Sequence, residues 1–201
     1  MIWRLLFLGV YVLFFLIRSP HGNRQSYDEK SNENLENSNL AVKREGKIST
    51  TMRSILSLIM LLGIIVYGFY PSWLIPFSLA LPNWLRLTGL GLAILTLPLL
   101  YWAHSSLGRQ YSPDLELKEE HKLISSGPYK VIRHPMYTIL IVFMLSISIF
   151  SANTLIFLPH IGAIILILLR LSKEEAMLIQ EFGDDYREYM MKTGRLLPRF
   201  N

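Results

Sequence analysis

The sequence predicts an all-α, polytopic integral membrane protein with about five transmembrane helices, and three observations lead to this fold class. Of the 201 residues, 51% are hydrophobic and only 17% are charged, and the mean hydropathy is +0.33. Soluble domains usually carry more charge. The apolar residues form long, nearly uncharged blocks, and 18 of the 20 Lys and Arg lie in alternate segments between those blocks. This alternation places the basic segments on one side of a membrane.

The apolar blocks give the individual spans, since one bilayer crossing needs about 20 apolar residues. The longest block, Tyr137–Leu169, has 33 uncharged residues and exceeds one crossing. It divides at the small polar turn 151–153 into a helical hairpin over residues 136–171. The other three blocks are Ile2–Ile17, Ile55–Tyr70 and Leu87–Ala103, which makes five spans in all.

The charge pattern also predicts the orientation. The basic segments are cytoplasmic by the positive-inside rule, and all 15 Asp and Glu lie in the same segments. The N-terminus is then outside and the C-terminus inside. The first span has no small-x-small cleavage site and is expected to remain uncleaved. Net basicity therefore marks a membrane face and membrane lipids, and no nucleic-acid partner is expected.

The chain is expected to divide into two regions. Residues 1–104 hold spans one to three with a polar cytoplasmic linker at 19–53, and residues 105–201 form the catalytic region. A proline- and aromatic-rich stretch, Pro71–Pro82, suits the outer interface. Ala176–Lys192 has apolar residues at helical spacing and predicts a C-terminal amphipathic helix, with Gly183 as a point of interruption.

Several site chemistries are excluded or disfavoured by residue content. The chain has no cysteine, which excludes disulfides, thiolate metal sites and a cysteine nucleophile. His121 and His134 lack a third ligand at a recognisable spacing, so we expect no metal site. The sequence also lacks a Walker A motif, GxGxxG and GxSxG.

The first candidate segment for chemistry is His121–Tyr137, HKLISSGPYKVIRHPMY. Pro135 suits the first turn of the fourth span, and a helix N-terminus beside Arg133 and His134 would offer free amide groups to a carboxylate or phosphate. Tyr129 and Tyr137 add aromatic faces, which attract cations. This combination suits a zwitterionic ligand. The alternative is that Arg133 and His134 only anchor the helix at the lipid head groups.

The second candidate segment is Arg170–Glu175, RLSKEE, which follows the fifth span and meets the membrane on the same side. Arg170 and Glu174 have i,i+4 spacing and can pair along a helix. Ionisable residues at such a boundary are candidates for a functional site. The alternative is an exposed ion pair that contributes about 0–1 kcal/mol.

Together these residues carry a family resemblance. The strings His121-Lys-Leu123, Gly127-x-Tyr129 and Arg133-His134-Pro135-x-Tyr137, followed by Glu174-Glu175 and Phe182-Gly183-x-x-Tyr186-x-x-Tyr189, resemble the isoprenylcysteine carboxyl methyltransferase family. The wider group includes membrane phospholipid N-methyltransferases, and the closest resemblance is to compact five-span prokaryotic members. It covers roughly the last 80–90 residues. It implies a cytoplasmic pocket for S-adenosylmethionine without a Rossmann fold.

The resemblance also implies roles for individual residues. Glu175 is expected to contact the cofactor, and Arg170 and Glu174 are expected nearer the methyl acceptor as catalytic residues. The expected cofactor-binding residues, with Arg133 added from its place at the helix N-terminus, are His121, Leu123, Gly127, Tyr129, Arg133, His134, Pro135, Tyr137 and Glu175.

The acceptor stays open at this point. A lipophilic acceptor would enter from the bilayer and the soluble cofactor from the cytoplasm. A carboxylate, as in an isoprenylcysteine, is already a nucleophile, and Arg170 would orient it. A phospholipid amine must lose a proton, and Glu174 would be its base. Two other readings remain: an NADPH-dependent sterol-reductase-like enzyme, which shares the Arg-His-Pro-x-Tyr element, and a non-catalytic membrane scaffold.

Overall fold

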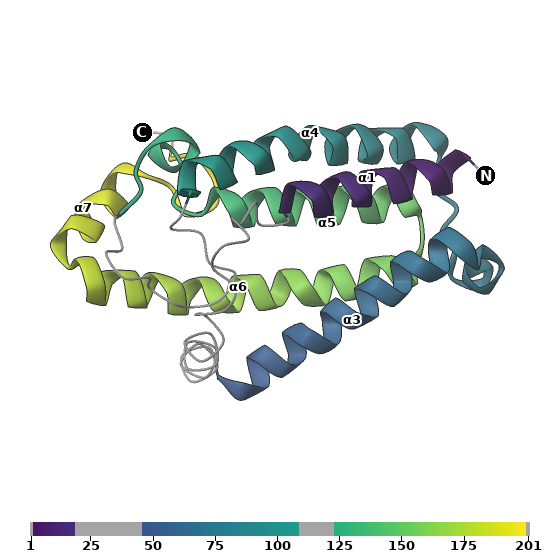
Figure 1. Cartoon of the computed structure of the whole chain (residues 1–201), viewed down its shortest axis with the longest axis horizontal. Coiled ribbons are helices and arrows are strands. Elements are labelled where there is room, and N and C mark those ends of the chain that lie inside the picture. Colours follow the sequence, from purple (N-terminus) through teal and green to yellow (C-terminus); the bar gives the residue numbers. More distant parts are fainter. Residues whose placement is uncertain (1, 19–45, 109–122, 200–201) are drawn as a thin grey trace, which may run out of the picture.

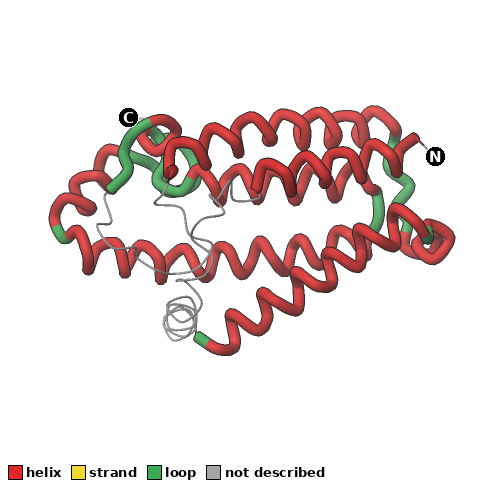
Figure 2. Tube along the Cα trace, in the orientation of Figure 1, coloured by secondary structure: helices red, strands yellow, loops and turns green. Residues whose placement is uncertain are grey.

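The fold is a bundle of long helices. The computed structural model describes residues 2–18, 46–108 and 123–199, and the described part contains helices and two isolated β-bridges. Figure 1 traces the chain in sequence colours, and Figure 2 shows the predominance of helix. The elements are α1 (Ile2–Arg18), α3 (Lys47–Phe69), the 3-10 helix η2 (Pro71–Phe77), α4 (Asn83–Leu107), the 3-10 helix η4 (Gly127–Lys130), α5 (Pro135–Ser151), α6 (Thr154–Phe182) and α7 (Asp184–Lys192).

The long helices run back and forth along the long axis of the molecule. Helix α4 packs against α1 and α5, and α6 packs against α3 and α5. The start of α1, η2 and the α5–α6 turn lie at one end of the bundle, whereas η4, the start of α5 and α7 lie at the other (Figure 1). The described segments that precede α5 and follow α6 therefore meet at the α7 end.

All five predicted spans correspond to helices, and three helices in the described part of the chain are long and apolar enough to cross a membrane by themselves. These are α3, α4 and α6, with 23, 25 and 29 residues. Helix α5 is apolar but has 17 residues, and α1 also has 17 residues. The reason for the shorter α5 is its boundaries, because Pro135 begins it and Ala152, in the left-handed region at φ 50°, ends it. An integral membrane protein with several spans is thus confirmed.

A glycine allows the close approach of α4 and α5. A Cβ atom added at Gly89 would lie 2.7 Å from the backbone oxygen of Ser146 and 2.9 Å from the backbone nitrogen of Phe150. Apolar side chains gain little from burial when the alternative solvent is lipid, so helices in membranes depend on such close packing. Gly89 therefore fixes the separation of the two helices.

Helix α1 is held to the bundle by aromatic side chains and one buried hydrogen bond. Phe14 stacks on Phe143 of α5 with ring centroids 4.3 Å apart, and Phe7 packs against Tyr67 of α3 at the same distance. The hydroxyl of Tyr11 lies 2.9 Å from Nε2 of His160 on α6. The partner of this buried histidine is thus a residue of α1, and His160 has a structural role in the membrane-spanning part.

The end of the bundle opposite α7 is closed by the turn between α5 and α6. The Asn153 side chain accepts a hydrogen bond from Leu155 N at 3.0 Å and caps α6. Its amide also donates to the carbonyl oxygen of Leu74 at 2.9 Å. The η2 segment, within the stretch predicted to lie at the outer interface, is therefore tied to this turn.

The C-terminal part differs from the prediction in one respect. The amphipathic helix does not begin at Ala176, because α6 continues without a break from Thr154 to Phe182. The break falls at Gly183, whose φ of 55° favours glycine, and α7 begins at the next residue. The expected interruption at Gly183 is confirmed, and Glu174 and Glu175 lie within a helix that continues the fifth span.

Candidate active site

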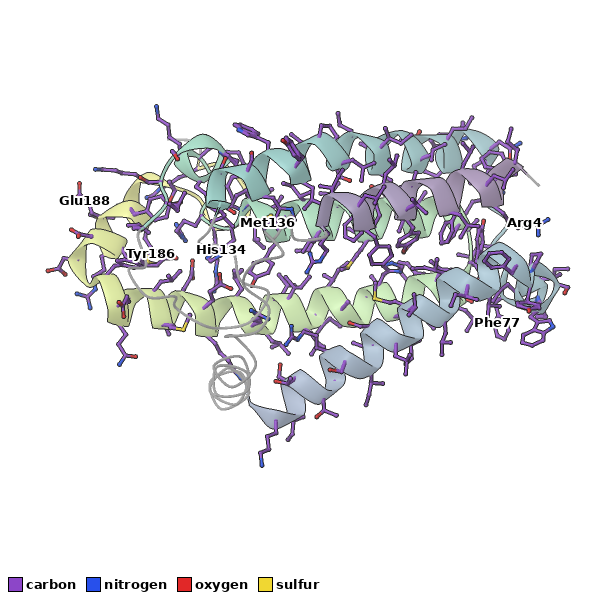
Figure 3. The ribbon with its side chains drawn as sticks, in the orientation of Figure 1. Arg4, Phe77, His134, Met136, Tyr186 and Glu188 are labelled. Carbon is purple, nitrogen blue, oxygen red and sulfur yellow. The ribbon has the colours of Figure 1, made fainter. Side chains whose placement is uncertain are left out.

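The two segments singled out in the sequence meet at the α7 end of the bundle. His134 caps the N-terminus of α5, and its ring lies between two carboxylates of α6. Its Nδ1 is 3.6 Å from Oε1 of Glu174, and its Nε2 is 3.4 Å from Oε1 of Glu175. Figure 3 shows His134 at the same end as Tyr186 and Glu188, far from Arg4 and Phe77. Residues 40 positions apart thus form one ionic cluster.

Glu175 is the centre of that cluster. Its Oε1 lies 3.0 Å from Nε of Arg133, and its Oε2 lies 2.9 Å from Nε of Arg195. The residue is buried, with 8% of its surface exposed. A buried carboxylate needs such partners, since an unpaired buried charge is strongly destabilising. Both oxygens of Glu175 are therefore occupied by cationic groups of the protein.

Glu174 has a different environment on the side nearer the membrane-spanning part. Its Oε2 accepts a hydrogen bond from the Tyr137 hydroxyl at 2.5 Å. The charge of Arg170, one helical turn earlier, acts on both Tyr137 and Glu174. The side chain of Glu174 keeps 24% of its surface exposed. Glu174 is thus more accessible to a ligand than Glu175.

The two carboxylates of the cluster favour the charged form of His134. Burial by itself would lower its pKa, but the hydrogen bonds and negative charges of Glu174 and Glu175 outweigh burial and raise the pKa of His134. Its ring also stacks near Tyr137, with centroids 5.8 Å apart and planes at 20°. The cluster therefore contains a buried imidazole whose protonation two carboxylates favour.

The C-terminal segment holds the start of α5 through backbone hydrogen bonds. The amide groups of Arg133 and His134 are not free for a ligand, because they donate to the carbonyl oxygens of Gly194 (2.8 Å) and Arg195 (3.2 Å). The Arg133 guanidinium also donates to the carbonyl oxygen of Met190 at 3.1 Å and to that of Thr193. The backbone amides of Arg133 and His134 are therefore used within the protein. Sequence reasoning missed this pairing because a short parallel bridge leaves no periodic signal.

The remaining predicted site residues lie in the loop before α5 and at its start. Gly127 has φ 58°, and a Cβ atom there would lie 2.6 Å from Oγ of Ser106 on α4. Tyr129 is buried, and its carbonyl oxygen accepts a hydrogen bond from Tyr189 of α7 at 2.5 Å. Leu123 is half-buried, and Pro135 is buried at the first position of α5. His121 lies outside the described residues.

Two further residues, Arg195 and Tyr186, belong to the cluster, although sequence reasoning did not assign them to the site. Arg195 pairs with Glu175 and donates to the Ser172 hydroxyl at 3.0 Å. Tyr186 was part of the motif that carries the resemblance but was given no role in the site, and the charges of Glu175, Arg133 and Glu174 act on its buried hydroxyl. A single basic residue after a helix, such as Arg195, gives no distinguishing signal in the sequence. Within the described ranges, no group of three His, Asp or Glu side chains is placed to hold a metal ion.

The arrangement is that of a polar site at the end of a membrane bundle. Its carboxylates can bind a cation, its guanidinium and imidazolium groups can bind an anion, and its tyrosines supply aromatic faces. Such a donor set suits a ligand that carries both charges.

Comparison with known proteins confirms the resemblance seen in the motifs. Residues 89–180 match the model of the isoprenylcysteine carboxyl methyltransferase (ICMT) family. Protein-S-isoprenylcysteine O-methyltransferase B of Arabidopsis thaliana is 26% identical over 174 residues, which are 81% of this chain and 85% of that protein. A rice relative (Oryza sativa subsp. indica), named as a probable protein-S-isoprenylcysteine O-methyltransferase, is 31% identical over 98 residues, 45% of this chain and 49% of its own length.

One solved structure shares the fold. The eukaryotic intramembrane Ras methyltransferase ICMT superposes with a TM-score of 0.52 and 24% identity, over 76% of this chain and 53% of that protein. The chain thus spans about half the length of this structure and of the rice relative. The all-helical membrane fold predicted from the sequence is confirmed by this match.

Proposed function

We propose that this chain, whose residues 89–180 match the ICMT family, is an integral membrane methyltransferase that uses S-adenosylmethionine. Its acceptor is a lipophilic molecule, and the carboxylate of an isoprenylcysteine-like substrate is the best candidate. The observation that carries the proposal is the cluster of Glu174, Glu175 and His134 at the end of α6, directly beside Arg170 and Tyr137.

The residues of the cluster fit the cofactor's chemistry. S-adenosylmethionine has a carboxylate, an ammonium and a sulfonium, and it supplies a methyl group bonded to that sulfonium. Carboxylates and aromatic faces suit the two cations, and guanidinium or imidazolium groups suit the carboxylate. In this proposal the cofactor-binding residues are those of the segment 121–137, and the partly exposed Glu174 faces the ligands.

Glu175 has a positioning role in this proposal. Its two oxygens pair with Arg133, His134 and Arg195, which belong to the loop before α5 and to the C-terminal segment. It therefore fixes the two chain segments that would surround the cofactor. This refines the expectation that Glu175 contacts the cofactor directly.

Arg170 and Glu174 have the roles nearest the acceptor. Methyl transfer is an in-line displacement at carbon, so the protein's main contributions are alignment and exclusion of water, worth about 7–11 kcal/mol when orientation is complete. The Arg170 guanidinium would hold an acceptor carboxylate as a fork, and no general base is needed. An amine acceptor would instead require Glu174 to take its proton.

The orientation follows from the same proposal. The described basic residues just before α5 and in the C-terminal part lie at the α7 end of the bundle, so we assign that end to the cytoplasm by the positive-inside rule. The cofactor would enter from there, and the acceptor would enter laterally from the bilayer.

Calorimetry of the purified chain in detergent tests the cofactor directly. We expect S-adenosylhomocysteine to bind and NADPH not to bind, with weaker S-adenosylhomocysteine binding in Glu174→Gln. The matched control is Glu188→Gln, an exposed glutamate of α7 that pairs with Lys192 and should bind as the wild type does. NADPH binding without S-adenosylhomocysteine binding would overturn the proposal and favour the reductase reading. Binding of neither ligand by folded protein would favour the scaffold reading.

A further inference from the structure

One buried hydroxyl of the cluster lacks a partner within the described part of the chain. Tyr186, in the first turns of α7, has 1% of its surface exposed, and its Oη has no hydrogen-bond partner among the described residues. A buried hydroxyl without a hydrogen-bond partner destabilises the folded protein by about 1–3 kcal/mol. Such a group requires an explanation, because buried polar groups in proteins nearly always have partners.

The hydroxyls of two neighbouring tyrosines do have partners. Tyr189, one helical turn along α7, donates to the carbonyl oxygen of Tyr129, and Tyr137 donates to Glu174, each at 2.5 Å. The rings of Tyr186 and Tyr189 lie 5.8 Å apart. Of these three hydroxyls, that of Tyr186 is the one without a hydrogen bond among the described residues.

The hydroxyl lies in the electrostatic field of the cluster. Burial first, and then the charge of Glu175, raise the pKa of Tyr186, so it keeps its proton at neutral pH and acts as a donor. The charges of Arg133 and Glu174 also act on it. Figure 3 shows Tyr186 and His134 at the same end of the bundle. A buried hydroxyl that keeps its proton needs an acceptor, and a carboxylate oxygen is a strong one.

We propose that the hydroxyl of Tyr186 is a cofactor-binding group that donates a hydrogen bond to the carboxylate of the methyl donor's amino-acid part. This inference rests on the proposed function. Tyr186 belongs to α7, beyond the end of α6, whereas Arg170 lies nearer the membrane-spanning part. The soluble ligand is therefore the one within its reach. It has a single carboxylate, which is its strongest acceptor of a hydrogen bond.

The test is calorimetry of the full chain in detergent with S-adenosylhomocysteine and with its decarboxylated analogue, for wild type and Tyr186→Phe. We expect Tyr186→Phe to bind S-adenosylhomocysteine about tenfold more weakly, the usual effect of a lost hydrogen bond to a charged group. The two proteins should bind the analogue equally, because the analogue lacks the group that Tyr186 contacts.

The unfolding temperature separates binding from structure. Without ligand, the unfolding temperature of Tyr186→Phe should equal or exceed that of the wild type, because the substitution removes a buried hydroxyl that has no hydrogen-bond partner. Tyr189→Phe is the contrast, and it should unfold at a lower temperature because it loses its bond to Tyr129. A lower unfolding temperature for Tyr186→Phe would overturn the inference and assign the residue a structural role.

The remaining outcomes are also decisive. Equal binding of S-adenosylhomocysteine by wild type and Tyr186→Phe would overturn the inference and leave the proposed function intact. Equal weakening for both ligands would overturn the carboxylate assignment. If the folded wild type does not bind S-adenosylhomocysteine, the proposed function fails, and the inference fails with it.

Discussion

Arg133 and Glu175, 42 positions apart in the chain, form an ion pair with Nε and Oε1 3.0 Å apart, and their side chains are only 9% and 11% exposed. Arg133 precedes α5 and Glu175 lies near the end of α6, so the pair joins the two helices of the hairpin at the end where they are not connected by a turn. Arg195 on the other oxygen of Glu175 adds the C-terminal segment to the same junction.

Glu175→Gln should therefore destabilise the protein strongly. The substitution keeps the shape of the side chain but leaves the largely buried Arg133 and its neighbour Arg195 without their carboxylate partner. It also removes one of the two carboxylates beside His134. Removing one partner of a buried pair costs about 3–5 kcal/mol. Thermal unfolding in detergent should show a large decrease in unfolding temperature. Glu188→Gln removes an exposed pair and should change stability by about 0–1 kcal/mol. Similar small effects for both substitutions would contradict the central role of Glu175.

The raised pKa of His134 predicts that the stability of the protein depends on pH. Its pKa is raised in the folded protein, so the protonated ring contributes stability that is fully present below the unfolded value of about 6.5 and is lost as pH rises through the raised folded pKa. The difference in unfolding temperature between wild type and His134→Gln should therefore shrink as the pH increases above about 6.5. The other histidines are common to both proteins and cancel in this comparison. A difference that grows with pH would show that His134 is neutral in the folded state.

Gly89 and Gly91 offer a matched pair of substitutions on α4. A Cβ atom at Gly89 meets the backbone of α5 at 2.7 Å and 2.9 Å, whereas one at Gly91 has no atom within 4 Å. Gly89→Ala should destabilise by about 1–3 kcal/mol because the helices must separate. Gly91→Ala should be neutral or stabilising by up to about 1 kcal/mol, since alanine favours a helix. Unfolding in detergent of the two variants measures both effects, and equal stability would show that α4 and α5 do not pack this closely.

The hydrogen bond between Tyr11 and His160 should contribute measurably to the docking of α1. A double-mutant cycle with Tyr11→Phe and His160→Leu isolates the pair. The contact of His160 Nδ1 with the carbonyl oxygen of Ile156 is lost in both His160→Leu proteins and cancels in the cycle. Hydrogen bonds between membrane helices contribute about 0.6 kcal/mol on average and about 1.7 at most. We expect a coupling energy in that range from unfolding measurements in detergent. Additive effects of the two substitutions would mean that the residues do not interact.

The fold and the two halves of the site follow from the sequence because their signals are local. Uncharged blocks predict the helices, Pro135 predicts the start of α5, and Gly183 predicts a break. The continuity of α6 beyond the membrane boundary was not predicted, because charged residues such as Lys173 and Glu174 are as compatible with a helix as with a linker. The pairing of Gly194 with Val131 and Arg133 was not predicted either, since it depends on tertiary contact alone.

The different environments of Glu174 and Glu175 could not be predicted from the sequence either. Two adjacent glutamates are indistinguishable in the sequence, yet on a helix they point about 100° apart. Glu175 turns towards Arg133 and Arg195, and Glu174 turns towards Tyr137. Only the packing of α6 against the start of α5 separates their environments.

The measurement that decides the proposed function is transfer of a labelled methyl group from S-adenosylmethionine to a farnesylated cysteine derivative by the purified chain in lipid. We expect a labelled product that releases methanol in base, as a methyl ester does, and loss of that product in Arg170→Ala. A labelled product that is stable in base, formed instead with an amine lipid, would assign the acceptor to phospholipids. Folded wild-type protein that transfers no methyl group to either acceptor would overturn the proposed function.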